Sequence, residues 1–251
     1  MSPRPLPGVT VVTGAAQGIG EAIARRLVAD GGRVTLLDVA PHVEETARRI
    51  GAVGAVRVDI TDVDALQAAI HGVAEAHGGL DTLVNCAGTC GRESFEELSL
   101  ATWRRDLDTN LTAMAFACQA AVFPHMKTQG SGRLVNIASV SGKVGGVGPV
   151  SADGAGGRSG AGYTSAKAGA INLSRWVARQ VGAWGITCNT VAPGPIASPM
   201  AAGAEYGVED LPVPRLGQPD EVAAAVAYLV GPGSDYTTGT CLHVDGGMVR
   251  A

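Results

Sequence analysis

The sequence predicts a doubly wound α/β fold, in which helices cover both faces of a seven-stranded parallel sheet. Short β-branched runs alternate with amphipathic helical stretches along the whole chain, and a glycine-rich turn joins the first run to the first helix. Aromatic residues make up only 4% of the 251 residues, whereas Ala, Gly and Val abound, which suits close packing of helices on a sheet. We therefore expect a single domain over residues 1–251.

Seven short runs rich in Val, Ile, Leu and Thr have the length and composition of buried strands. The expected strands are Val9–Thr13, Arg33–Leu37, Ala55–Val58, Thr82–Asn85, Arg133–Ala138, Ile186–Val191 and Thr240–Val244. The stretches between them predict helices at Ile19–Asp30, His42–Ile50, Asp62–His77, Leu100–Met126, Gly162–Gly182 and Pro219–Val230. Two segments interrupt the alternation: a Gly-rich insert at about residues 142–160 and a short substrate flap at about residues 198–211.

Charge and cysteine content exclude several classes of function. The net charge of −4 is spread over mixed acidic and basic residues without a basic block, so we expect no nucleic-acid partner. The five cysteines fit neither a disulfide framework nor a metal site in number and spacing. The longest uncharged runs are interrupted by prolines or by Asn and Gln, so we expect no membrane span. A cytoplasmic protein with a small-molecule substrate is the expectation.

The first strand is followed by the segment Thr13–Gly20, which reads TGAAQGIG and leads directly into a helix. Glycines let the backbone turn sharply and approach a pyrophosphate, and the helix amino terminus offers N–H donors and a positive dipole end. A strand, a glycine turn and a helix in this order predict a phosphate cradle rather than a plain turn. We expect the cradle to be formed by Gly14, Gln17, Gly18, Ile19 and Gly20.

Asp38 ends the second strand and indicates which dinucleotide binds. A carboxylate in this place accepts hydrogen bonds from both hydroxyls of the adenosine ribose and repels the 2′-phosphate of NADP. Neither Gln17 nor Val39 supplies a cation for that phosphate, so the sequence favours NAD. The alternative is an aspartate that only caps the following helix.

The ends of the third and fourth strands extend the same crevice, because the carboxyl ends of parallel strands lie at one edge of the sheet. Asp59 and Ile60 close the third strand, and the stretch Asn85–Gly88 closes the fourth. We expect cofactor contacts from Asp59, Ile60, Asn85, Ala87 and Gly88. We expect Asp59 to face the adenine amino group, although capping of the next helix explains it nearly as well. The small residues Ala87 and Gly88 let the adenosine pass.

Tyr163 and Lys167 are four residues apart, so their side chains are neighbours on one face of a helix. A nearby ammonium group favours the phenolate and lowers the pKa of the tyrosine, and the positive ring of oxidised nicotinamide adds to this effect. We therefore expect Tyr163 to act as base towards an alcohol or as acid towards a ketone. Alone, such a pair occurs by chance in many helices.

Ser139 and Asn110 complete the candidate catalytic set. Ser139 ends the fifth strand, where its hydroxyl would hold the reacting oxygen in position for hydride transfer. Asn110 lies in the long helix before that strand and would fix a water molecule that links Lys167 to solvent protons. Taken singly, a serine at a strand end is usually a turn residue, and a helical asparagine often bonds a neighbouring carbonyl.

Together and in this order, these motifs resemble the short-chain dehydrogenase/reductase family over essentially the whole chain. The resemblance extends to Thr238-Gly239 and Asp245-Gly246-Gly247, and the Tyr–Lys spacing resembles the short, reductase-type branch rather than the enoyl-reductase branch. It implies a Rossmann-type sheet, a homotetramer and a catalytic tetrad. The tetrad residues are Asn110, Ser139, Tyr163 and Lys167. The further cofactor contacts that the resemblance implies are Pro193, Gly194, Ile196 and Ser198 beside the nicotinamide, with Tyr163 and Lys167.

The main departure from the family pattern is the insert between Ser139 and Tyr163, which makes their separation roughly twice the usual one. Nine glycines stand among the 23 residues between them, which favours an irregular loop over a helix. The loop either has no role or lines the pocket through Ser141, Val144, Val147 or Val150, with Arg158 meeting an acidic substrate group or another subunit. Arg92 faces either the substrate mouth or solvent.

The sequence thus predicts an NAD-dependent oxidoreductase that interconverts a secondary alcohol and a ketone, with Tyr163 as acid and base. One alternative is a 3-oxoacyl-thioester reductase acting on a carrier protein; such enzymes usually prefer NADP, which Asp38 opposes. The other is a non-catalytic NAD-sensing or scaffold protein, a class that commonly lacks part of the tetrad. No motif identifies the alcohol.

Overall fold

In the computed structural model, which describes residues 7–148, 159–201 and 206–249, seven strands form one parallel sheet. They are β1 Val9–Thr13, β2 Arg33–Asp38, β3 Gly54–Arg57, β4 Thr82–Asn85, β5 Gly132–Ile137, β6 Ile186–Pro193 and β7 Cys241–Val244. Their order is β3-β2-β1-β4-β5-β6-β7, with parallel pairing throughout. The predicted fold class is confirmed, and the strand bounds lie within one or two residues of the expected ones.

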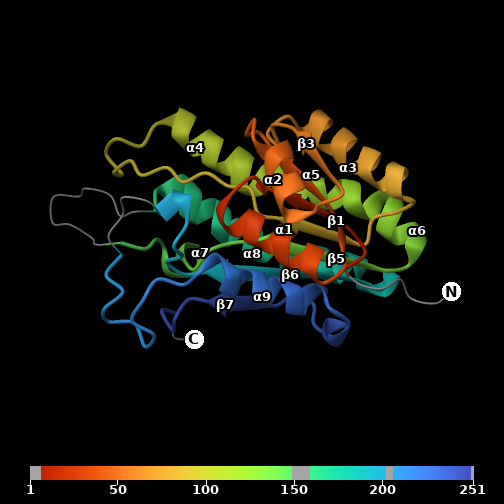
Figure 1. Cartoon of the computed structure of the whole chain (residues 1–251). Helices are drawn as coiled ribbons and strands as arrows, with labels where there is room; N and C mark the ends of the chain where they lie inside the picture. The colour runs from red at the N-terminus through yellow and green to blue at the C-terminus, as the bar shows by residue number, and fades with distance from the viewer. Residues whose placement is uncertain (1–6, 149–158, 202–205, 250–251) are drawn as a thin grey trace.

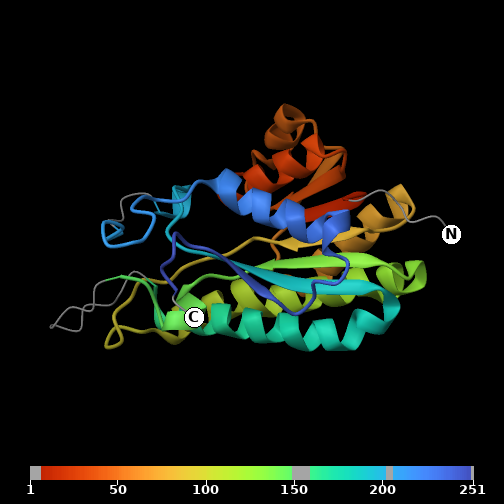
Figure 2. The same cartoon turned by 90° about the horizontal axis from the view of Figure 1, so that it is seen from below.

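Helices cover both faces of the sheet (Figures 1 and 2). One face carries α1 (Gly18–Ala29), α2 (Val43–Ile50) and α9 (Pro219–Val230). The other carries α3 (Val63–His77), α5 (Ala113–Ala120) and α8 (Ala161–Val181), and α4 (Leu100–Leu107) packs against α8. The shorter helical elements are η1 Asp108–Thr112, η2 Ala121–Met126, α6 Lys127–Gln129, α7 Ser141–Val144, η3 Gly182–Trp184, η4 Pro199–Ala201 and η5 Pro232–Ser234.

The sheet separates two apolar cores, and the central strands contribute side chains to both. On the α1 side, Leu36 of β2 packs with Ile23 and Leu229, whereas on the α8 side Leu83 and Leu134 pack with helices α3 and α5. Strands buried on both faces have few charged residues and many apolar ones. The strand bounds predicted from the sequence therefore lie close to the observed bounds. In the described part of the chain, no helix is both long and apolar enough to cross a membrane.

The expected long helix Leu100–Met126 is wrong in its continuity. The helix widens into a π-helical turn at η1, resumes as α5, and is interrupted at Phe123, whose φ of −114° and ψ of 121° are not helical. Phe123 precedes Pro124, and the proline ring disfavours helical dihedral angles in the residue before it. The first turn of the insert also differs from the expected irregular loop, because Ser141–Val144 form α7.

The fold brings the chemistry-bearing residues to one place. β1 and β4 are neighbours in the middle of the sheet, although the chain connects β1 to β2 on the opposite side. At such a switch point, the loops that follow the two strands diverge and leave a crevice at the carboxyl edge of the sheet.

Candidate active site

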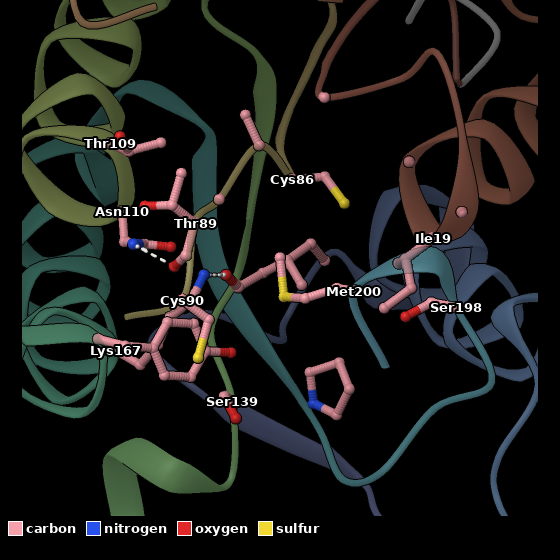
Figure 3. Close-up of a pocket in the computed structure, with 18 of the residues that line it drawn as sticks. Ile19, Cys86, Thr89, Cys90, Thr109, Asn110, Ser139, Lys167, Ser198 and Met200 are labelled. Carbon is pink, nitrogen blue, oxygen red and sulfur yellow. Dashed lines mark hydrogen bonds between the residues drawn. The ribbon is translucent and has the colours of Figure 1, made fainter. Parts of the chain in front are cut away.

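A cavity of about 580 Å³ occupies this crevice. In Figure 3, Asn110, Lys167 and Ser139 lie on one side of it and Ile19 and Ser198 on the other. Every predicted site residue except Asn85 lines the cavity. The structure therefore brings together segments from the first glycine turn, the end of β4, α8 and the loop after β6.

The glycine turn has the geometry of a phosphate cradle. Gly14 and Gly18 have φ angles of 65° and 62°, a left-handed conformation that favours glycine. A Cβ on Gly14 would lie 2.5 Å from Ala87 Cα, so the turn also needs glycine for its close approach to the end of β4. Gln17 occupies the N-cap position of α1, but its side chain makes no capping hydrogen bond to any described residue. The first N–H groups of α1 thus remain available to an anion, and these residues fit a dinucleotide pyrophosphate.

Thr13 connects the two loops that flank the switch point. Its Oγ1 accepts hydrogen bonds from the N–H groups of Cys86, at 3.1 Å, and Ala87, at 3.2 Å. Thr13 belongs to the predicted glycine motif, but the motif alone does not indicate this role. Its position at the last residue of β1, before a glycine, is the signal that marks it.

Asp38 is held in place by the turn it faces. Its Oδ2 accepts a hydrogen bond from the Ala16 N–H and its Oδ1 one from the Ala40 N–H, both at 2.9 Å. A carboxylate has about four acceptor sites, so both oxygens keep capacity for a ribose diol. Because His42 is the N-cap residue of α2, Asp38 does not cap that helix.

Asp59 also lines the cavity, and its carboxylate is engaged locally. Its Oδ1 accepts hydrogen bonds from the Thr61 N–H at 2.9 Å and the Thr61 hydroxyl at 2.8 Å. The cap of α3 is instead Asp62, which accepts from the Ala65 N–H. Asp59 is therefore a turn residue that lines the cavity rather than a helix cap.

Asn85 does not reach the cavity. Its Nδ2 donates to Asn136 Oδ1 at 2.8 Å, and Asn136 Nδ2 donates to Ser174 Oγ at 2.9 Å. Asn85 and Asn136 are register partners in β4 and β5, so the buried Asn85 amide finds its acceptor inside the protein. The side chain of Asn85 therefore points into the core, and contact between this residue and the cofactor stays a prediction.

Tyr163 and Lys167 are stacked on the first turns of α8, as their spacing predicts. Lys167 Nζ lies 5.5 Å from the centroid of the Tyr163 ring and donates to the Ile137 carbonyl at 2.8 Å. Burial lowers the pKa of Lys167 to about 8. Burial also raises the pKa of Tyr163 above its ordinary value, and a hydrogen bond with Ser139 acts in the opposite direction. The expected lowering of the Tyr163 pKa by Lys167 is therefore wrong for the protein alone: burial raises this pKa, and the groups that lower it are Ser139 and Arg92.

Ser139 is brought to Tyr163 by the first turn of the insert. Ser139 Oγ accepts from the Ser141 N–H at 3.1 Å, and the Thr164 hydroxyl donates to the Ser141 carbonyl at 3.0 Å. A Cβ on Gly142 would lie 2.5 Å from the Ala168 nitrogen, so α7 packs directly on the backbone of α8. The two hydroxyls meet because this turn folds back at once, whatever the length of the connection.

Asn110 lies in the π-helical turn η1, an arrangement frequent at functional sites. Its Nδ2 donates to the carbonyls of Thr89, at 2.9 Å, and Asp106, at 2.8 Å. Its Oδ1 is buried and accepts no hydrogen bond from any described residue. A Cβ on Gly88 would lie 2.7 Å from this oxygen and 3.6 Å from Lys167 Nζ, so both groups face Gly88. Glycine is needed at this position for that reason.

The remaining part of the cavity was only partly predicted. Ser141 and Val147 of the insert line it, whereas Val144 is exposed; Val150 and Arg158 lie outside the described residues. Arg92 lines the cavity and donates to the Met200 carbonyl at 2.8 Å, so it is not simply a solvated arginine. Lining residues that sequence reasoning missed are Arg105 of α4 and Thr109 of η1, together with Thr89, Ser159, Met200 and Tyr206 outside the long helices and strands; none of them belongs to a readable motif.

Known proteins resemble this chain over nearly its full length. A family model described as enoyl-(acyl carrier protein) reductase matches residues 14–249. The chain is 39% identical to a cis-4-hydroxycyclohexanecarboxylate dehydrogenase of Sinomonas cyclohexanicum, with 95% of both chains covered. It is 34% identical to a 3-oxoacyl-[acyl-carrier-protein] reductase of Vibrio cholerae, with 96% of both covered. A (3R)-3-hydroxyacyl-CoA dehydrogenase of Mus musculus is 33% identical, over 96% of this chain and 95% of that one.

Proposed function

The chain belongs to the short-chain dehydrogenase/reductase family, and from this premise we propose that it is an NAD-dependent oxidoreductase that interconverts a secondary alcohol and a ketone. One observation carries the proposal: the hydroxyls of Tyr163 and Ser139 meet beside buried Lys167 at one end of a cavity whose other end is the glycine cradle. We propose that residues 1–251 act as one dinucleotide-binding and catalytic domain.

The residues of this chain have distinct roles in the proposed reaction. The glycine turn and the first N–H groups of α1 hold the pyrophosphate, Asp38 holds the adenosine ribose, and the loop Pro193–Ser198 holds the nicotinamide. When bound, the nicotinamide cofactor accepts or supplies the hydride. Ser139 orients the reacting oxygen by a hydrogen bond, and Tyr163 removes or delivers the proton at that oxygen.

Lys167 and Asn110 serve proton supply in this proposal. Asn110 Oδ1 is buried with acceptor capacity left over, and both it and Lys167 Nζ face Gly88. A water molecule that donates to Asn110 Oδ1 would relay protons between Lys167 and solvent. The ammonium charge of Lys167 beside the Tyr163 ring stabilises the phenolate that forms when Tyr163 gives up its proton.

The preference for NAD is tested by replacing Asp38 with serine. Serine keeps a short polar side chain but removes the negative charge that opposes the 2′-phosphate of NADP. We expect the ratio of kcat/KM for NAD⁺ to that for NADP⁺ to fall by about tenfold or more, which corresponds to about 1.4 kcal/mol. Spectrophotometry at 340 nm with each cofactor measures the ratio, and Asp64→Ser, at an exposed position of α3, is the matched control. An unchanged ratio would refute the ribose role of Asp38.

The pH dependence follows from the raised pKa of Tyr163. Alcohol oxidation needs the phenolate, whose fraction grows about tenfold per pH unit below its pKa, whereas ketone reduction needs the phenol, which is almost fully present near neutrality. We expect log kcat/KM for oxidation to rise with pH up to about 8, where Lys167 has lost half of its charge. Reduction should stay nearly flat over the same range. Initial rates in both directions give the two profiles, and a flat oxidation profile contradicts the role of Tyr163.

A second candidate is reduction of a 3-oxoacyl thioester, because two of the relatives are named for 3-oxoacyl and 3-hydroxyacyl thioesters. Asp38 argues against a strong preference for NADP, and the relative of 39% identity is named instead for a hydroxycyclohexanecarboxylate. Assays of cis-4-hydroxycyclohexanecarboxylate oxidation and acetoacetyl-thioester reduction, each with both cofactors, separate the two. A chain that binds NADH but turns over neither these compounds nor a broad alcohol panel would support the non-catalytic, NAD-sensing alternative.

We also propose a homotetramer in a reducing compartment such as the cytoplasm. Support for assembly comes from large apolar side chains exposed on the helices of the α8 face, Phe116 at 39%, Phe123 at 45% and Trp176 at 61%. Support for the compartment comes from the cysteines, all of which are free: Cys86, Cys90, Cys118, Cys188 and Cys241.

A further inference from the structure

Two arginines give the catalytic end of the cavity a positive charge. Arg92 and Arg105 both line the main cavity and an adjoining open hollow of about 450 Å³ between the end of β4 and α4. Among the described residues that line the main cavity, the carboxylates are Asp38 and Asp59, and both belong to the adenosine end. A neutral alcohol has no charged group that would form an ion pair with these two arginines.

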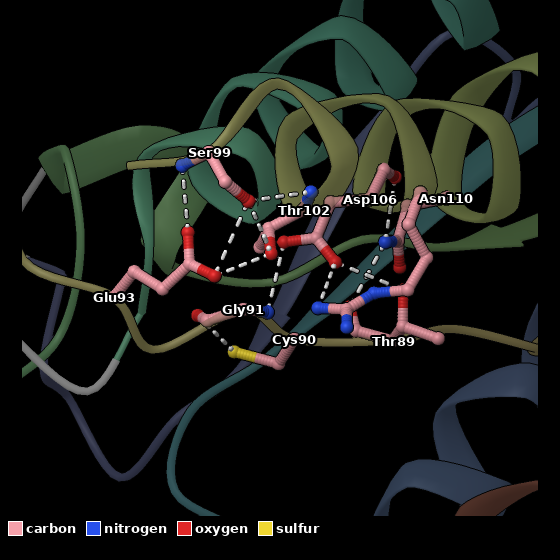
Figure 4. Close-up of polar contacts among 9 residues, drawn as sticks. Thr89, Cys90, Gly91, Glu93, Ser99, Thr102, Asp106 and Asn110 are labelled. Carbon is pink, nitrogen blue, oxygen red and sulfur yellow. Dashed lines mark hydrogen bonds and ion pairs between the residues drawn. The ribbon is translucent and has the colours of Figure 1, made fainter. Parts of the chain in front are cut away.

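Arg105 is anchored by a buried carboxylate. Asp106 is fully buried and accepts hydrogen bonds from the Thr89 hydroxyl at 3.0 Å, the Gly91 N–H at 2.8 Å and one Arg105 nitrogen at 3.2 Å (Figure 4). The Arg105 side chain nevertheless remains 51% exposed. A guanidinium has five N–H donors in a rigid plane, so this single contact fixes the group while leaving donors for a ligand.

Nearby Glu93 does not occupy the Arg105 donors in the way Asp106 does. Its carboxylate accepts hydrogen bonds from the Thr102 hydroxyl and the Ser99 N–H, at 2.9 Å for the latter, as Figure 4 shows. These hydrogen bonds are the main cause of its lowered pKa, and the charge of Arg105 adds a smaller effect. The hydrogen bonds of Glu93 thus tie it to the first turn of α4.

Arg92 extends the positive charge towards the reacting centre. Its guanidinium donates to the Met200 carbonyl at 2.8 Å, which holds it across the connection that follows β6. The charge of Arg92 lowers the pKa of both Tyr163 and Cys90. Burial raises both pKa values by a larger amount. The guanidinium of Arg92 is therefore within electrostatic reach of the phenol that handles the substrate oxygen.

We propose that Arg105, anchored by Asp106, and Arg92 bind a carboxylate of the substrate while Tyr163 and Ser139 hold its reacting oxygen. The substrate class is then a small hydroxy acid and the matching oxo acid, and this inference rests on the proposed function. Planar guanidinium groups bind carboxylates through paired, charge-assisted hydrogen bonds. A distant phosphate of a carrier arm fits less well, because both arginines line the same cavity as Tyr163.

The test is a binding measurement that needs no turnover. Isothermal titration of the protein saturated with NADH compares cyclohexanecarboxylate with cyclohexanecarboxamide, which have nearly the same shape and differ in charge. We expect the carboxylate to bind about tenfold or more tightly than the amide. Arg105→Gln and Arg92→Gln should each reduce this ratio by about fivefold or more, while NADH binding shows that the variants are folded.

Arg104→Gln is the matched control, because Arg104 is the exposed neighbour on α4 and does not line either hollow. It removes the same charge and should leave the ratio unchanged. Equal affinity of the wild-type protein for acid and amide, or no effect of either lining arginine, overturns the inference. A protein that binds the carboxylate but oxidises no secondary alcohol refutes only the proposed function. One that oxidises neutral alcohols but does not prefer the carboxylate refutes only this inference.

Discussion

Replacement of Tyr163 by phenylalanine is expected to lower kcat by about a thousandfold in both directions while NADH binding stays within about twofold of wild type. The substitution removes only the hydroxyl that exchanges a proton with the substrate oxygen, and the ring stays packed beside Lys167. Tyr163 is itself an expected cofactor contact, but the proposed pyrophosphate cradle lies at the other end of the cavity, so we expect cofactor affinity to change little when this one hydroxyl is lost. Initial rates at 340 nm and NADH fluorescence titration measure the two quantities.

Tyr236→Phe is the matched control for this experiment. The Tyr236 side chain is fully exposed and lies outside the cavity, so loss of its hydroxyl should change neither rate nor binding. A Tyr163→Phe enzyme that keeps more than about a tenth of the wild-type kcat would show that another group moves the proton. Loss of NADH binding would instead show that the variant had disturbed the cavity itself.

The fold was readable from the sequence because its strands are buried on both faces. Runs such as Val9–Thr13 and Thr82–Asn85 are buried at every residue and contain no charged side chain, so they stand out against the amphipathic helices between them. The crevice then follows from topology, since the carboxyl ends of parallel strands share one edge. Tyr163 and Lys167 were predictable as neighbours because helical spacing alone brings them together.

What the sequence did not reveal depends on contacts between distant segments. Asn85 sits at a strand end that suggested a ligand contact, but its register partner Asn136 draws its amide into the core. The pKa of Tyr163 is set by burial, which a sequence does not report. Arg105 looks like any surface arginine until Asp106, buried beneath the Thr89–Gly91 corner, is seen to hold it.

Replacement of Gly20 by alanine is expected to destabilise the protein by about 3 kcal/mol and to weaken NADH binding by at least about tenfold. Gly20 is buried in the first turn of α1, and a Cβ there would overlap the Gly14 carbonyl oxygen and lie 2.8 Å from its carbon. Gly14 has no room to yield, because its own turn packs against Ala87. The clash must therefore push α1 away from the turn, which moves the N–H donors of the proposed phosphate cradle.

Gly72→Ala adds the same single methyl group, but we expect it to raise the free energy of unfolding rather than to lower it. Gly72 is exposed in α3, and a Cβ there would meet no described atom within 4 Å, so alanine should stabilise the helix by about 0.5–1 kcal/mol. Urea unfolding of both variants measures the two free energies, and NADH titration measures the binding. If both substitutions stabilise, the close approach of Gly20 to Gly14 does not require glycine, and the prediction is wrong. Opposite signs would show that the cradle depends on the contact between two backbones that glycine permits.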